Sequence, residues 1–224
     1  MADTILSDSV SKDDSGHTNL ALQRIQLSNL LSFGPDTPPL SLRPLNILIG
    51  ANGSGKSNLI DAISLLRSCA GDIQSTLRRG GGVLEWIWKG NPQGVASIEA
   101  IVTRRAEEPL RHKLDFAARQ QTFQIVDEVI EDTKIYGDYS NLMYYYRYQN
   151  GSPIVNTINF YEDGSPFYHE YQVTHTDRNL SALKAFSDEL HYPEIAHISN
   201  QYNALDLLHK SVFTKQSTML PLDR

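Results

Sequence analysis

The residues most able to do chemistry stand in one run of eight: Gly50, Ala51, Asn52, Gly53, Ser54, Gly55, Lys56 and Ser57. This run fits the pattern G-x-x-x-x-G-K-S/T, in which glycines let backbone N–H groups turn inward around an anion. The lysine supplies a positive charge for the β- and γ-phosphates of a nucleotide, and the final hydroxyl can bind Mg²⁺. We therefore expect ATP and Mg²⁺ here, with Ser57 as metal ligand and Asn58 among the nucleotide-binding residues. The alternative is a chance match in a glycine-rich turn.

Such a loop needs a strand before it and a helix after it. Leu45–Ile49 is mostly apolar and runs straight into the first glycine, which predicts a buried strand. Beyond the loop, Leu59, Ile63 and Leu66 recur at the spacing of one helix face, and Gly71 is a plausible stop. The positive end of that helix dipole points at the loop, which favours a bound phosphate.

The rest of the chain divides into a polar start and a strand-rich middle. Residues 1–18 are rich in Ser, Asp and Lys, which predicts a flexible tail before a folded part over 19–224. Asn150-Gly151 predicts a hairpin turn within a β-rich flank over 83–174. Alternating or apolar runs predict strands at Leu22–Leu27, Leu40–Leu42, Val95–Thr103, Leu114–Ala117, Thr122–Ile130, Met143–Tyr148, Ile154–Tyr161 and Phe167–Thr174.

Further helices are expected on both sides of that flank. Asp72 can cap a short helix that ends at Arg79. A helical segment is predicted over 178–210, at Leu180–Leu190 and around Asn203–His209, with Pro193 separating the two helices.

Composition bounds the class of protein. The 224 residues carry a formal net charge of -6, which weakly disfavours a dedicated nucleic-acid-coating protein. The one cysteine, Cys69, excludes an internal disulfide and gives no sign of secretion. No apolar run approaches the ~20 residues of a membrane span. We expect a cytoplasmic protein with no membrane partner.

The residues around the loop resemble a known family. Gly50–Ile63 is similar to the SMC/RecF-like branch of ATP-binding-cassette ATPases, which includes many bacterial AAA-type ATPases. Ile25–Gly34 resembles that family's opening strand and turn, and Leu77–Gly82 with Trp86–Gly90 resembles a stretch of the bacterial members. The resemblance implies an α/β fold of the P-loop NTPase, ABC/SMC type: a first lobe with an antiparallel β-rich flank. Family members hydrolyse ATP between two heads.

The second lobe of such a head is not recognisable in the sequence. Phe123–Glu128 is the one candidate for the buried strand that presents an acidic pair to Mg²⁺, but Gln124 interrupts it, so an ordinary flank strand is favoured. No Leu-Ser-Gly-Gly-like signature is present. We expect the N-terminal part of a head, which binds ATP and hydrolyses it only when a second lobe or a homo-oligomeric head completes the site.

Three functions follow from these observations. The first is an SMC/RecF-like ATPase in DNA maintenance or anti-phage defence, which would reach nucleic acid through the assembled complex. The second is a regulatory or scaffold module that senses ATP without hydrolysing it. The third, a small-molecule kinase, is disfavoured because the β-rich middle offers no helical lid over the phosphates.

Several single residues have two interpretations. Phe33 could stack on the adenine or simply pack, and packing is favoured. Gln201 could sense Mg²⁺ and water, although its neighbours form no recognisable loop. The tyrosines within Tyr144–Tyr148 could stack on bases, but aromatic residues are favoured in any strand.

Overall fold

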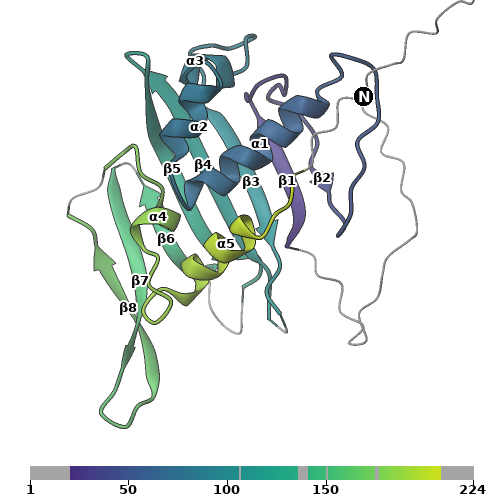
Figure 1. Ribbon diagram of the computed structural model, residues 1–224. Helices are drawn as coiled ribbons and strands as arrows, with labels where there is room; N and C mark the ends of the chain where they lie inside the picture. Colours follow the sequence, from purple (N-terminus) through teal and green to yellow (C-terminus); the bar gives the residue numbers. More distant parts are fainter. Residues whose placement is uncertain (1–20, 106, 136–140, 150, 175–176, 208–224) are drawn as a thin grey trace, which may run out of the picture.

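The computed structural model describes residues 21–207, apart from 106, 136–140, 150 and 175–176. Its framework is one antiparallel sheet in the order β2-β1-β3-β4-β5-β6-β7-β8, with the helices on one face (Figure 1). The strands are β1 (Leu22–Ser28), β2 (Leu40–Ser41), β3 (Ala96–Val102), β4 (Leu110–Arg119), β5 (Thr122–Asp132), β6 (Tyr144–Gln149), β7 (Ser152–Phe160) and β8 (Pro166–Gln172). The predicted antiparallel, β-rich flank is confirmed, and it continues through β1 and β2 into the same sheet.

The strand pattern follows the alternation of the sequence. In β4, Leu110, His112, Leu114 and Phe116 are all fully buried, while the residues between them are only partly buried. The prediction of a strand over Leu114–Ala117 was too short because a buried histidine breaks the apolar pattern. The predicted 1–18 tail and Asn150 lie outside the described residues.

The helices complete the core. They are α1 (Lys56–Cys69), α2 (Ile73–Arg79), α3 (Val83–Trp86), α4 (Ala182–Ala185) and α5 (Pro193–Asn203). The predicted helix after the loop is confirmed, and its buried face is Leu59, Ala62, Leu65, Leu66 and Cys69. The predicted cap of α2 is also confirmed, since Ser75 N donates to Asp72 Oδ1 at 2.9 Å. Within the described ranges, no helix combines the length and apolar character needed to cross a membrane.

The predicted strand over Leu45–Ile49 is wrong. Leu48 makes one isolated bridge, and no strand is assigned to this segment. Leu45, Ile47 and Ile49 alternate along it and are 59%, 44% and 52% exposed. An apolar run predicts burial only if the chain supplies a neighbour to cover it, and none of the eight described strands pairs with this run.

The two predicted helices at the C-terminal side are also wrong in their limits. Of Leu180–Leu190, only α4 is helical, with Ser181 Oγ accepting from Leu183 N as the cap. Of the predicted helix around Asn203–His209, residues 204–207 are not helical because α5 ends at Asn203, and residues 208–209 lie outside the described residues. Pro193 does not separate two helices but begins α5, where its missing N–H costs nothing.

Ionised side chains join the sheet to α5. Arg104 lies 3.0 Å from Asp132 and 3.9 Å from Glu194, and both carboxylates are buried. Burial raises the pKa of each carboxyl group, and Arg104 opposes both shifts. This cation, together with the hydroxyls of Tyr145 and Tyr168 that donate to Asp132 and Glu194, compensates for packing the two acidic groups between β5 and α5.

Candidate nucleotide-binding loop

The loop over 50–55 leads directly into α1 and is covered by its own lysine. Lys56 Nζ donates to the carbonyl oxygens of Gly50 at 2.7 Å and Ala51 at 2.6 Å, and to Ser54 Oγ at 3.2 Å. No acidic residue stands in the first turn of α1, and its N-cap, Gly55, has no side chain to accept from the helix. A cation beside the positive end of a helix suits an anionic ligand.

The glycines are required by the shape of this loop. Gly53 and Gly55 have φ values of 79° and 90°, a region that other residues rarely adopt. A Cβ atom on Gly50 would lie 2.9 Å from Ser54 Oγ. Asn52 and Ser57 are exposed, and Asn58 is partly buried. The Lys56 ammonium group and the Ser57 hydroxyl thus stand side by side at the start of α1, where the glycine loop ends, and these two groups suit a phosphate with Mg²⁺.

A turn that follows β1 packs against this loop. A Cβ on Gly55 would lie 3.2 Å from Ser32 Oγ and 4.0 Å from Phe33 Cζ. Phe33 is partly buried and packs against the hydrophobic core. The packing interpretation of Phe33 is confirmed, while its contact with adenine stays a prediction.

The same turn is strained and is held by the segment after α3. Asn29 and Leu31 have φ values of 50° and 52°, and such residues usually persist only where the surroundings fix them. Leu31 N donates to Trp86 O at 2.6 Å, and Trp88 N donates to Asn29 O at 2.9 Å. The Trp88 ring lies 3.5 Å from the position of a Cβ on Gly34.

This support was missed in the sequence, where Trp86–Gly90 served only as a family likeness. The contact joins Gly34 to Trp88, which is far along the chain. Sequence spacing alone does not reveal such a pair. The turn after β1 packs against Gly55, and the Trp86–Gly90 segment holds that turn in place.

The acidic pair of β5 is engaged elsewhere. Glu128 is 1% exposed and accepts from Ser181 Oγ at 2.5 Å and Ala182 N at 2.8 Å. Its Oε1 also lies 3.1 Å from His112 Nε2, and His112 Nδ1 lies 2.8 Å from Tyr202 Oη. These contacts tie the sheet to α4 and α5 and leave Glu128 no access to solvent.

Glu128 also lies at the wrong end of α1. Glu128 accepts from Ser181 and Ala182 at the start of α4, and α4 contacts α1 near its last turn, away from the loop that precedes α1 (Figure 1). A helix rises about 1.5 Å per residue, so the 14 residues of α1 separate its ends by about 20 Å. Lys56 is the first residue of α1, whereas Glu128 lies near the other end of this helix. The interpretation of Phe123–Glu128 as an ordinary flank strand is therefore confirmed.

The remaining candidates are placed as follows. Tyr145, Tyr146 and Tyr148 are 4%, 2% and 4% exposed, so the strand interpretation is confirmed and base stacking by these three is wrong. Gln201 lies in the last turn of α5 rather than in a loop. Among the described residues, no group of three or more His, Cys, Asp or Glu side chains could hold a metal ion.

Comparison with known proteins identifies the family. No curated protein matches the chain. The family model described as "AAA domain, putative AbiEii toxin, Type IV TA system" matches residues 45–212, which include the loop, α1, most of the sheet and α5. The chain therefore belongs to this family of AAA domains.

Proposed function

We propose that the chain binds ATP with Mg²⁺ at Gly50–Asn58. The observation that carries this proposal is the Lys56 ammonium group, which is held against the glycine loop at the start of α1. Its partners among the described residues are two neutral carbonyl oxygens and a hydroxyl, so no carboxylate of that part of the chain competes with an incoming phosphate for this cation. Membership of the AAA family supports a nucleotide as the ligand.

Each loop residue has a distinct part in this binding. The backbone N–H groups of the loop surround the phosphates, and Lys56 exchanges the carbonyls of Gly50 and Ala51 for phosphate oxygens. The Ser57 hydroxyl is the protein ligand for Mg²⁺, which neutralises charge on the phosphates when bound. Phe33, beside Gly55, is positioned to limit where the rest of the nucleotide lies.

We further propose that hydrolysis requires a second lobe or a partner head of the SMC/RecF type. Glu128 is buried and accepts hydrogen bonds from Ser181 and Ala182 at the start of α4, so it does not supply the acid that holds Mg²⁺. The exposed apolar stripe of Leu45, Ile47 and Ile49 runs into the loop and suits a covering strand. A strand from the completing lobe would bury this stripe and bring its carboxylate to the phosphates.

Two biological settings remain for this activity. By resemblance to SMC/RecF-like heads, the ATPase would serve DNA maintenance or anti-phage defence. An ATP-sensing regulatory or scaffold module is the second candidate, and the engagement of Glu128 away from the loop favours it, since binding then occurs without turnover.

Nucleotide binding is tested with Lys56→Ala. Charge-assisted hydrogen bonds contribute about 1.5–3 kcal/mol, so we expect roughly a 10- to 100-fold loss of ATP·Mg²⁺ affinity by titration calorimetry. Lys89→Ala is the matched control, because Lys89 is exposed and pairs with Glu85 and a backbone carbonyl. Equal affinities of the two variants would refute a nucleotide site at this loop.

Hydrolysis is tested separately with the same purified chain. We expect ATP binding with turnover far below ~1 s⁻¹, the low end of ordinary enzymes. A steady-state rate of ~10 s⁻¹ from the isolated chain, abolished by Lys56→Ala, would show that no completing lobe is needed.

A further inference from the structure

The last strand of the sheet has an open edge. β8 pairs only with β7 among the described residues, and it is drawn at the left margin of the sheet in Figure 1. Hydrogen-bonded positions of the β7–β8 ladder are odd-numbered, because Tyr161 N donates to Ser165 O and Val173 N donates to Pro153 O, both at 2.9 Å. Antiparallel strands alternate between bonded and non-bonded pairs. The backbone groups of Tyr168, Glu170 and Gln172 therefore point away from β7.

A second hydrogen bond confirms this parity. Ile158 is opposite Tyr168, yet Ile158 N donates to His191 O at 2.9 Å, on the side away from β8. The Ile158–Tyr168 pair is thus a non-bonded pair. Three N–H groups and three carbonyl groups form a regular row on the outer side of β8.

This edge carries only part of the usual protection against pairing, namely Pro166 at its first position and the charge of Glu170. Natural edge strands are commonly very short, bulged or supplied with lysine. The other edge strand, β2, has two residues, whereas β8 has seven and a ladder without a register shift. Pro166 blocks only the first position of β8.

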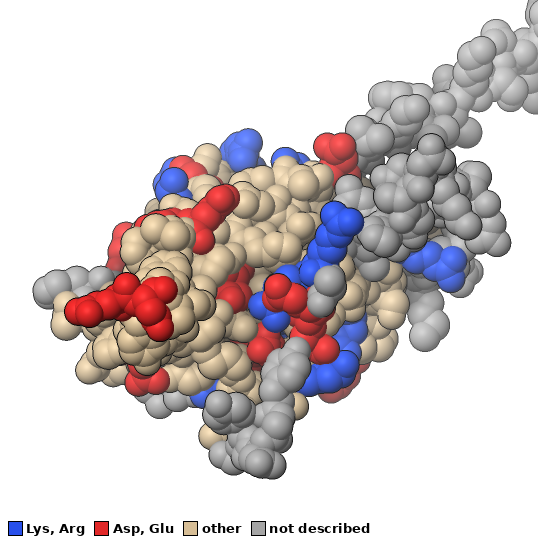
Figure 2. All heavy atoms as spheres, turned by 90° about the horizontal axis from the view of Figure 1, so that it is seen from below, with Lys and Arg blue, Asp and Glu red and all other residues tan. Residues whose placement is uncertain are grey.

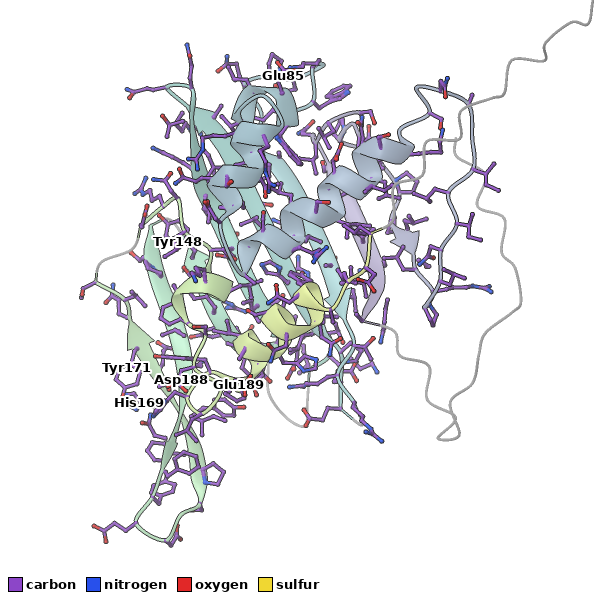
Figure 3. All side chains as sticks on the ribbon, viewed as in Figure 1. Glu85, Tyr148, His169, Tyr171, Asp188 and Glu189 are labelled. Atoms are coloured by element: carbon purple, nitrogen blue, oxygen red, sulfur yellow. The ribbon has the colours of Figure 1, made fainter. Side chains whose placement is uncertain are left out.

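The hairpin also exposes aromatic side chains. Tyr168 and Tyr171 are 44% and 46% exposed, and Phe160 and Tyr161 next to the turn are 49% and 58% exposed. Figure 3 shows His169 and Tyr171 along β8 at the margin of the sheet, and their ring centroids lie 4.4 Å apart. Exposed aromatic surface of this kind is typical of binding surfaces.

The charge of the hairpin has one sign. No Lys or Arg occurs from Gly151 to Asp177, whereas Glu162, Asp163 and Glu170 are acidic. Figure 2 shows acidic side chains gathered at the left end of the molecule, which is the end of the β7–β8 hairpin in Figure 1. This charge repels nucleic acid and favours a basic polypeptide.

We propose that β8 accepts an additional strand from a partner protein, contributed by an extended segment in which Lys or Arg alternates with Val or Thr. The partner's backbone pairs with Tyr168, Glu170 and Gln172, and its basic side chains lie near Glu170 and the acidic turn. This inference is independent of nucleotide binding, because it uses neither the loop nor α1.

The test uses the full chain and the synthetic peptide acetyl-TKVKVKT-amide. We expect the amides of Tyr168, Glu170 and Gln172 to exchange freely in the chain alone and to slow at least roughly tenfold at saturating peptide, which corresponds to about 1.4 kcal/mol. The same peptide with glutamate in place of lysine, or with its alternate amides N-methylated, is expected not to protect them. Equal protection by the lysine and glutamate peptides would overturn the proposal.

Two variants separate backbone pairing from charge. Gln172→Pro removes an outward N–H without touching the β7 ladder and is expected to weaken binding at least threefold relative to Gln172→Ala. Glu170→Gln keeps an acceptor for the Tyr144 hydroxyl and removes one charge, so it is expected to weaken only the lysine peptide. Unchanged binding by Gln172→Pro would exclude strand addition at β8.

The same experiments show whether β8 is instead covered by a segment of the chain itself or by a second copy of the chain. If the three amides are already protected in the monomeric chain, a segment of the chain itself covers β8 and the proposal is wrong. If sedimentation shows a dimer that Gln172→Pro dissociates, the occupant is a second copy and the proposal is equally wrong.

Discussion

Replacing Glu128 distinguishes a structural carboxylate from a catalytic one. Glu128→Ala leaves three buried polar groups without their hydrogen-bond partner: the Ser181 hydroxyl, the Ala182 N–H and the His112 ring nitrogen. Each unpaired group lowers the free energy of unfolding by about 1–3 kcal/mol, and because the cavity relaxes in part we expect a total loss of roughly 4–6 kcal/mol. Since small domains have only about 5–15 kcal/mol of stability, the loss removes much of the margin.

Urea unfolding followed by circular dichroism at pH 7 measures this loss. Glu128→Gln retains one acceptor and the shape of the side chain, so we expect a smaller cost of about 1–3 kcal/mol. Glu162→Ala is the matched control, because Glu162 is exposed and close to the turn of the hairpin. Nucleotide affinity of folded Glu128→Gln should stay within about threefold of the parent.

The reasoning is refuted if Glu128→Ala unfolds within 1 kcal/mol of the Glu162→Ala control. It is also refuted if Glu128→Gln keeps full stability but loses Mg²⁺-dependent nucleotide binding. That second pattern would mean that β5 approaches the phosphates after all.

Three further predictions concern buried groups. Arg104→Met leaves Asp132 and Glu194 buried without their cation and should cost about 3 kcal/mol at pH 7. Loss of the cation raises the native pKa values of both carboxyl groups further, so this cost should grow as pH rises through the native pKa values of the parent, which already lie above 3.8 and 4.5, and should disappear at lower pH. Cys69 is buried with a raised pKa, so a thiol reagent should label it only on unfolding. Gly80→Ala should cost about 1–3 kcal/mol, since its Cβ would lie 2.5 Å from an indole nitrogen.

Each of these has a direct check. Arg104→Met is followed by urea midpoints between pH 4 and pH 7, and an equal loss at both would contradict the carboxylate argument. Cys69 labelling is compared with and without denaturant, and rapid native labelling would show that the site is open. Gly71→Ala is the control for Gly80→Ala, because the nearest atom to its Cβ is a carbonyl oxygen at 3.9 Å.

The sequence revealed those parts of the fold that depend on local pattern. The glycine run, the amphipathic α1 and the Asp72 cap are properties of adjacent residues, and each was predicted within a residue or two. Strands β3 to β8 were found because side chains alternate and turns separate them. These features need no knowledge of distant neighbours.

The errors arose where tertiary contacts decide. Leu45–Ile49 reads as a buried strand, but burial depends on a covering neighbour that the described sheet does not supply. The helix predicted over Leu180–Leu190 begins only at Ala182, because Ser181 is its N-cap and donates to Glu128, a residue more than fifty positions away. For the same reason the Trp88 support of the Gly34 turn could not be inferred from spacing.

The connectivity of the sheet bears on how the chain is made. From β3 to β8 every strand pairs with its successor, so this part can add strands in order as it leaves the ribosome. The β1–β3 ladder forms later than the β1–β2 pair, because the segment from Asn29 to Val95, which contains the whole nucleotide loop, separates β1 from β3 in the sequence. Ser28 and Ser97 are register partners and close that segment at its base. The loop should therefore reach its final form only once translation has passed β3.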